Sequence, residues 1–270
     1  MTTAPTSLAG LVPGVEPQPG RRRAWARQIM GMPISVHVRG DGARGPAAAA
    51  AASGLFADLR VADALFSTYR EDSEINRLAR GELDLDDCDP ALREVHHLCE
   101  VARERTGGYV DAWAVPGRPG EFDPTVLVKT WAVARAARRF DALPGLALAV
   151  GAGGDILLTP GDEPDPWRIG IEDPRDRTRL LATVPVRDGG IATSGVAARG
   201  AHIFDPHTGD PALEVLSATV IGPSVMWADV WATAAIARGA AAVDWVETLH
   251  GTSGMLVLAD GRVHRWQNAP

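Results

Sequence analysis

Lysine and cysteine are almost missing from this 270-residue chain, and each shortage carries information. The two cysteines, Cys88 and Cys99, are too few for a disulfide framework, and no His or Cys stands beside them at the spacing of a zinc site. Of the 27 basic residues only Lys129 is a lysine. This lysine either occurs by chance, which the count alone favours, or stands at a position where a compact ammonium group is needed.

Long apolar runs and an excess of positive charge are missing as well. No apolar stretch approaches about 18 residues, the length that indicates a membrane-spanning helix. The net charge of −7 argues against a nucleic-acid-binding surface. Residues 1–20 contain no apolar core of the kind found in secretion signals. We therefore expect a cytoplasmic protein with no membrane span and no nucleic-acid partner.

What is present is the composition of a globular protein, 46% hydrophobic and 23% charged. Residues 1–23 are rich in Pro, Gly, Thr and Arg, which favours a flexible leader with the run Arg21–Arg23 solvated within it. Residues 24–270 are long enough for a substantial core and contain no internal repeat and no clear linker. We expect this range to form a single domain.

Hydrophobic periodicity predicts a mixture of helices and strands. Alternation of Ile34, Val36 and Val38 predicts a strand within residues 28–39. Helices are predicted over residues 47–66, 74–80, 90–106, 125–140, 225–238 and 241–249. Further strands are predicted over residues 146–150, 156–159, 167–171, 180–186 and 217–221, with a hairpin over 255–266. Because this order lacks βαβ regularity, we expect an α+β fold.

The glycine-rich stretch Gly151–Asp155 does not predict a dinucleotide-binding loop. Its glycine register ends on Ile156, and a strand follows where a helix should open. A tight turn is the better interpretation, with the backbone approaching either a ligand or a neighbouring strand. On the predicted helix 90–106, His96 and His97 lie away from the apolar stripe and are expected to be solvated, whereas Cys99 is expected to be buried.

Asp229 and Thr233 are the sharpest candidates for chemistry. They stand four residues apart in an apolar run, so a helix would place them on one face, about 5–6 Å apart at Cβ. Their oxygens suit a hard cation such as Mg²⁺. An ionised carboxylate among bulky apolar side chains needs a partner, and a metal would supply one. A second candidate segment, His202–Gly209, sets His202 and Asp205 around a turn.

Eight short motifs, met in order along the chain, resemble the FAD:protein FMN transferases of the ApbE family. Each motif is weak alone, but together they run from residue 30 to residue 239. The motifs are Met30–Met32, Phe66–Tyr69 with Asp72–Ile75, Gly107–Trp113, Phe122–Lys129, Gly153–Asp155, Ala192–Gly195, His202–Gly209 and Ala228–Thr233.

The resemblance implies a fold related to the T-fold, with two interlocked lobes and a flavin site between them. It also implies Mg²⁺-dependent transfer of FMN from FAD to a Ser or Thr hydroxyl of a partner flavoprotein, with release of AMP. By position it implies a metal site at Val126 (through main-chain oxygen), Asp229, Ala232 and Thr233. Flavin-nucleotide contacts are implied at Met30, Tyr69, Tyr109, Val110, Asp111, Asp123, Lys129 and Ile203.

His202 stands at the position of the family's active-site histidine. A neutral imidazole near pH 7 could take the proton from an attacking hydroxyl. Asp205 as the base, or His202 as a phosphate contact, are the alternatives. For Tyr69 the alternative is a core aromatic, and for Asp123 it is a turn or helix-cap carboxylate.

Three positions depart from the family's usual pattern. Val126 and Thr130 stand where the family usually has a small residue or glycine, and Gly151 stands where it often has asparagine. The added bulk beside the expected metal leaves open an FAD-binding protein without turnover. The same scaffold also leaves open an FAD pyrophosphatase, in which water replaces the protein hydroxyl. The chain has no Asp-Gly-x-Ser/Thr-Gly-Ala-Thr acceptor sequence, so we interpret it as the donor enzyme.

Overall fold

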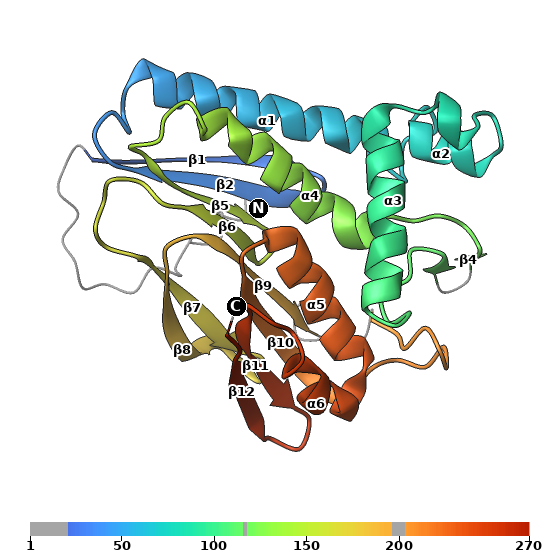
Figure 1. The fold of residues 1–270 in the computed structure, drawn as a ribbon. Coiled ribbons are helices and arrows are strands. Elements are labelled where there is room, and N and C mark those ends of the chain that lie inside the picture. Colours follow the sequence, from blue (N-terminus) through green and yellow to red (C-terminus); the bar gives the residue numbers. More distant parts are fainter. Residues whose placement is uncertain (1–20, 116–117, 196–202, 270) are drawn as a thin grey trace, which may run out of the picture.

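The computed structural model describes residues 21–115, 118–195 and 203–269, and an antiparallel sheet of eight strands forms its centre (Figure 1). The strand order is β1-β2-β5-β6-β9-β10-β11-β12. The strands are β1 (Arg22–Ile29), β2 (Met32–Arg39), β5 (Ala147–Ala152), β6 (Asp155–Thr159), β9 (Gly189–Gly195), β10 (Val215–Gly222), β11 (Ser253–Leu258) and β12 (Val263–Gln267). Two small ribbons accompany the sheet: β3 (Ala114–Val115) with β4 (Arg118–Pro119), and β7 (Trp167–Asp173) with β8 (Asp176–Val186).

Helices cover one face of this sheet (Figure 1). The long helices there are α1 (Pro46–Phe66), α4 (Thr125–Ala137) and α5 (Val225–Ala237), and α3 (Pro90–Arg105) stands across the end of α4. Shorter helices are α2 (Glu74–Ala79), α6 (Ala242–Val246), η1 (Leu85–Asp87), η2 (Arg138–Phe140) and η3 (Gly239–Ala241). In the described part of the chain, none of the helices combines the length and the apolar character that a membrane crossing needs.

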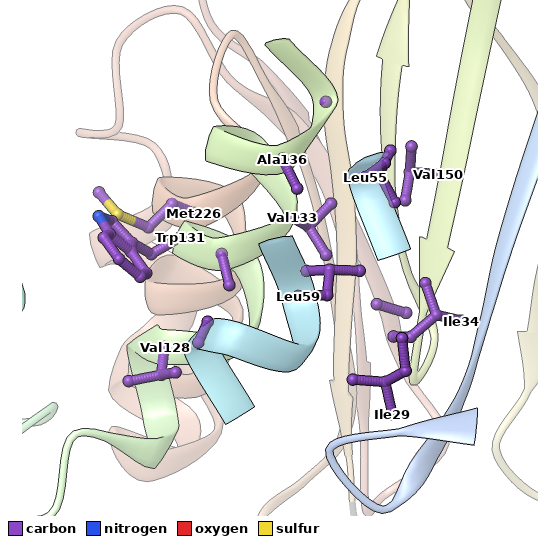
Figure 2. Packing of buried hydrophobic residues seen from close by; sticks show 14 of the residues in the cluster. Ile29, Ile34, Leu55, Leu59, Val128, Trp131, Val133, Ala136, Val150 and Met226 are labelled. Carbon is purple, nitrogen blue, oxygen red and sulfur yellow. The ribbon is translucent and has the colours of Figure 1, made fainter. Parts of the chain in front are cut away.

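Strand β5 shows how the sequence builds two layers of core. Side chains alternate across a strand, so Leu148 and Val150 face the helices while Ala147 and Ala149 face the β7–β8 ribbon. Both sets are buried, which explains the unbroken apolar run of this strand. Figure 2 shows Leu55 of α1 packing near Val150 on the helix side.

The helix side of the sheet carries two core regions that share one sheet. The first lies between α1, α3, α4 and strands β2 and β5. The second lies between α5, α6 and strands β10, β11 and β12. Helix α5 contributes to both, with Val230 and Ala234 in the first and Ala232 and Ala235 in the second. This helix therefore joins the two halves of the molecule.

The α+β fold expected from the sequence is confirmed, and so are most of its elements. Ser73 caps α2 by accepting a hydrogen bond from the Asn76 N–H, and Pro90 begins α3 as expected. Gly153 and Gly154, both with positive φ, form the two-residue turn between β5 and β6. The interpretation of these glycines as a tight turn before a strand is therefore correct.

The strand predicted within residues 28–39 is confirmed as β2, but three other expectations need correction. Strand β1, which pairs with β2, begins at Arg22, inside the range expected to be a flexible leader. Strand β9, which lies between β6 and β10, was not predicted at all. His96 is only 21% exposed and packs on Trp113 and Phe122, so it is not solvated.

A close approach between β9 and α5 places the functional candidates. A Cβ added at Gly190 would lie 2.3 Å from the Cα of Val225, so only glycine lets the strand pass under the first turn of the helix. The side chain of Ser224 caps this helix by accepting from the Trp227 N–H. Asp229 follows one turn later, directed toward α4 and the sheet.

Candidate active site

Three charged side chains meet beneath α4 and α5. Lys129 of α4 directs its ammonium group between two carboxylates, Asp155 at the start of β6 and Asp229 on α5. Lys129 Nζ lies 3.3 Å from Asp229 Oδ2 and forms an ion pair with Asp155. Asp155 and Asp229 are only 2% and 4% exposed. A buried cluster of this kind is costly unless its groups are paired, so the pairing is what keeps it in the fold.

Burial and the neighbouring charges shift the pKa values of this cluster in opposite directions. Burial raises the pKa of Asp229 to about 7, and the Asp155 carboxylate adds to the rise, while Lys129 and Thr130 oppose it. Burial acts to lower the pKa of Lys129, but attraction to the two carboxylates outweighs burial and raises that pKa. Lys129 pairs with both carboxylates, and a bound cation would likewise favour their ionised forms.

Local structure explains why these three side chains converge. Lys129 lies in the second turn of α4, whose first turn is capped by Asp123 Oδ1, which accepts from the Thr125 N–H at 3.1 Å. Asp155 is fixed by the Gly153-Gly154 turn, and its Oδ1 accepts from the Thr193 N–H of β9 at 3.1 Å. The site therefore draws on α4, α5, β6 and β9.

Thr233 lies one helical turn beyond Asp229 and faces the same part of the sheet. Its Oγ1 is 3.0 Å from the Oγ of Ser194, the neighbour of Thr193 on β9. The hydroxyl of Thr193 in turn lies 2.9 Å from that of Thr219 on β10. Because neighbouring side chains on a strand lie on opposite faces, only the Ser194–Thr233 pair lies on the α5 side of the sheet with Asp229, and the Thr193–Thr219 pair lies on the other face. Ala232, the neighbour of Thr233, is fully buried.

The residues present fit a divalent cation. Two buried carboxylates, Asp155 and Asp229, and the hydroxyl of Thr233 provide the oxygen ligands that a hard cation prefers. Among the residues that the structure describes, no three His, Cys, Asp or Glu side chains gather as a metal site. A cation here would therefore depend on hydroxyl, main-chain or substrate oxygens in addition to carboxylate.

The segment around Tyr109 borders a cavity of about 760 Å³. Val110 is buried, with its N–H donated to Thr106 Oγ1, and Asp111 bonds the Trp113 N–H and pairs with Arg103 at 3.0 Å. Tyr109 packs edge-on against His207. The residues that line the cavity are His96, Glu100, Arg103, Glu104, Gly107, Gly108, Trp113 and His207.

Other residues implied as flavin contacts lie at several places. Met30 occupies the β1–β2 turn with a φ of 54°, a conformation that costs a non-glycine residue energy. Tyr69 is 97% exposed, which excludes the alternative of a core aromatic. Ile203 is half-buried beside the second core region, and its carbonyl accepts from the Ala212 N–H. The flavin contacts of all three stay predictions.

The two candidates for the general base are His202 and Asp205. His202 lies outside the described residues. Asp205 Oδ1 accepts from the His207 N–H at 2.9 Å, and the Asp205 N–H donates to the carbonyl of Asp210, so this carboxylate stabilises a turn. His207 reaches from that turn to the carbonyl of Gly107, 3.1 Å from its Nε2. The turn is thereby held against the end of α3.

Two residues of the charged cluster were not among the site residues expected from the sequence. Asp155 was noted only as part of the Gly153–Asp155 motif, although its position after a double-glycine turn was a usable signal. Thr130 was noted only as added bulk, yet its hydroxyl donates to Asp229 Oδ2 at 3.1 Å. Gly151, a third departure, faces Ser35, whose Oγ would lie 2.8 Å from an added Cβ.

Comparison with known proteins identifies a family. The profile of the ApbE family matches residues 114–256, more than half of the chain. An FAD:protein FMN transferase of Klebsiella pneumoniae is 32% identical over 120 residues, and one of Salmonella typhimurium is 32% identical over 106 residues. These matches cover 40% and 36% of this chain and only 34% and 30% of the relatives, so the chain aligns with about a third of their length.

Solved structures extend the likeness over nearly the whole fold. The ApbE protein of Thermotoga maritima has a TM-score of 0.76 at 21% identity, covering 92% of this chain and 97% of that one. The flavin transferase ApbE of Vibrio cholerae has a TM-score of 0.77 at 22% identity, covering 93% and 98%. At these identities the structures show the fold alone. The family profile over residues 114–256 shows that the chain belongs to the ApbE family.

Proposed function

We propose that this protein transfers FMN from FAD to a Ser or Thr hydroxyl of a partner flavoprotein, with Mg²⁺ as the metal and AMP as the second product. The observation that carries the proposal is the buried cluster of Lys129, Asp155 and Asp229 in a chain of the ApbE family. The similar proteins of Klebsiella pneumoniae and Salmonella typhimurium bear the name FAD:protein FMN transferase.

The chemistry of phosphoryl transfer matches what the cluster offers. Such reactions depend on positioning and on neutralising negative charge more than on covalent participation by the protein. Asp229 and Thr233 would hold the metal, with Val126 and Ala232 contributing at or beside it. A bound Mg²⁺ supplies charge neutralisation on the phosphate oxygens of FAD. Lys129, whose Nζ lies 3.3 Å from Oδ2 of Asp229, would help to orient this carboxylate.

The bond changes balance without any further reactant. The acceptor hydroxyl oxygen attacks the phosphorus of the FMN half of FAD, and the bond from that phosphorus to the bridging oxygen breaks. The bridging oxygen leaves with AMP. The proton of the hydroxyl goes to a general base, for which His202 is the first candidate and Asp205 the second.

We place the flavin half of FAD in the cavity beside Tyr109. The 760 Å³ cavity beside Tyr109 is lined by Trp113 and by Arg103, and it lies next to the segment expected to contact the nucleotide. Aromatic side chains and a guanidinium group suit a flat ring with polar edges. Met30, Tyr69, Tyr109, Val110, Asp111, Asp123, Lys129 and Ile203 remain the proposed flavin-nucleotide contacts.

The test is purified protein incubated with FAD, Mg²⁺ and a polypeptide that carries the sequence Asp-Gly-x-Ser/Thr-Gly-Ala-Thr. We expect AMP in the solution and an added FMN on the acceptor, measured by chromatography and by mass spectrometry. Free FMN and AMP without any acceptor would favour the pyrophosphatase. Tight FAD binding that is indifferent to Mg²⁺, with no AMP released, would favour a binding protein without turnover.

A further inference from the structure

The hydroxyl of Thr130 points at the carboxylate on which the proposed metal site depends. Thr130 is 1% exposed and lies next to Lys129 on α4. Its Oγ1 is 3.1 Å from Asp229 Oδ2, on the neighbouring helix. The hydroxyl therefore links α4 to α5 at this carboxylate.

The direction of the hydrogen bond follows from the donors available. A threonine hydroxyl has one proton, and two acceptors lie near it: the carbonyl of Leu127 at 3.4 Å and Asp229 Oδ2 at 3.1 Å. Hydrogen bonds to an ionised acceptor are shorter and roughly twice as strong as neutral ones. The proton of Thr130 is therefore donated to Asp229.

Both contacts that the described residues make with the Asp229 carboxylate go to the same oxygen. Thr130 Oγ1 lies 3.1 Å and Lys129 Nζ lies 3.3 Å from Oδ2. The terminal torsion of an aspartate is broad and has little preference of its own. Two donors on one oxygen fix that torsion and leave Oδ1 as the oxygen offered to a cation.

We propose that Thr130 is a positioning residue for the metal site: its hydroxyl, together with Lys129, holds Oδ2 of Asp229 so that the other oxygen of the carboxylate is presented to Mg²⁺. This inference rests on the proposed function. Donors to a metal-ligating carboxylate typically contribute about 10–100-fold in metal affinity. The threonine at position 130 thus assists the site and does not merely crowd it.

The experiment measures the binding of Mn²⁺, a paramagnetic substitute for Mg²⁺, to the full chain in the presence of FAD. Two matched pairs isolate the hydroxyl. Wild type and Thr130→Val have side chains of the same shape and differ in the hydroxyl. Thr130→Ser and Thr130→Ala both lack the methyl group and also differ in the hydroxyl. We expect the dissociation constant of Mn²⁺ to rise about tenfold from wild type to Thr130→Val, and about tenfold from Thr130→Ser to Thr130→Ala.

A control variant separates positioning from stability. Thr252→Val removes another buried hydroxyl, one that accepts from Trp266 Nε1 at 3.1 Å, far from the charged cluster. It should lower the melting temperature and leave the affinity for Mn²⁺ unchanged. The Mg²⁺ concentration that half-saturates AMP release should rise in Thr130→Val, with the rate at saturating Mg²⁺ little changed.

Two outcomes would overturn the inference, and they are distinguishable. If wild type binds Mn²⁺ and releases AMP, and the variants with and without the hydroxyl bind Mn²⁺ equally, Thr130 does not position Asp229 and the proposed function stands. If wild type shows no saturable Mn²⁺ binding in the presence of FAD, the metal site itself is wrong and the inference fails with it.

Discussion

The carboxyl group of Asp229 is buried away from water. Burial raises its pKa to about 7, and the nearby Asp155 carboxylate adds to the rise. Lys129 offsets part of this cost through its ion pairs with both carboxylates. In the protein without a ligand, burial therefore disfavours the ionised form of Asp229. A bound cation would stabilise that form, as is common for carboxylates at functional sites.

Asp229→Asn should separate activity from stability. The amide keeps the shape of the side chain and removes a charge that burial disfavours. We therefore expect the melting temperature to stay the same or rise, while AMP release falls by about 100-fold or more because a metal ligand is lost. Asp244→Asn, on the exposed surface of α6, is the control and should change neither quantity. Full activity in Asp229→Asn would contradict the assigned role.

Both cysteines should be unreactive in the folded protein. Burial raises the pKa of Cys99 to about 12 and also raises that of Cys88. The reactive thiolate is therefore scarce at pH 8, and its fraction grows only as the pH approaches the raised pKa. A colorimetric thiol reagent at pH 8 should label no cysteine in the native protein and two after denaturation. Rapid labelling of Cys99 in the native state would show that its burial is wrong.

At the level of single residues, the sequence predicted the helix that carries Asp229 and Thr233 better than it predicted the contacts of these residues. The spacing of Asp229 and Thr233 on one helix was read correctly, because the apolar run around them left little doubt about a helix. The partner of Asp229 was not, because Lys129 and Asp155 lie on distant segments. Only the turn after β5 and the packing of α4 on α5 bring them together.

At the level of helices and strands, the close packing of β9 against α5 should be sensitive to a single substitution. A Cβ at Gly190 would lie 2.3 Å from the Cα of Val225, which is backbone and cannot move aside easily. Gly190→Ala should therefore destabilise the protein by about 1–3 kcal/mol, as overpacking does. Because α5 carries Asp229, the affinity for Mn²⁺ in the presence of FAD should fall as well.

Gly222→Ala is the matched control for this prediction. It lies at the end of β10, paired with Gly190 across the sheet, and an added Cβ would meet only the Cγ2 of Thr252 at 3.5 Å, an ordinary contact. Chemical denaturation should place its stability close to that of wild type. If Gly190→Ala were equally stable, the close approach between strand and helix would be incorrect.

Strands β1 and β9 show why some elements could not be predicted. In β1 nearly every side chain is exposed, so the sequence RRAWARQI carries no alternation, and Met30 is not a usual turn residue. In β9 the sequence GGIATSG has two glycines at its start and few large apolar residues, because α5 approaches it closely. Each strand lacks a clear sequence pattern because its residues are determined by tertiary packing.

At the scale of the whole molecule, Arg238 ties the end of α5 to the end of α3. Its guanidinium group donates to the carbonyl of Thr106 at 2.6 Å and lies over the rings of Tyr109 and Trp245, 4.2 and 4.4 Å from their centroids. Through Tyr109 and His207 the same contact reaches the 203–212 turn. One side chain thus connects the charged cluster's helix to the border of the cavity.

Arg238→Ala should lower the free energy of unfolding by about 2 kcal/mol, from a lost charge-assisted hydrogen bond and two cation–π contacts. It should also raise the KM for FAD, because Tyr109 loses its support. Arg265→Ala, an exposed arginine on β12, is the control and should change neither value. Urea denaturation and steady-state kinetics measure the two effects. An unchanged midpoint of urea unfolding would contradict the stabilising role of the Arg238 contacts.

The central claim is that the buried cluster at Asp229 holds a divalent cation when a flavin nucleotide is bound. The most direct measurement is an anomalous difference map from crystals of the full chain grown with FAD and Mn²⁺. The account predicts one strong peak within bonding distance of Asp229 and Thr233, next to the phosphates of FAD. A structure with FAD bound and no peak at these residues, or with the peak at another site, would contradict it.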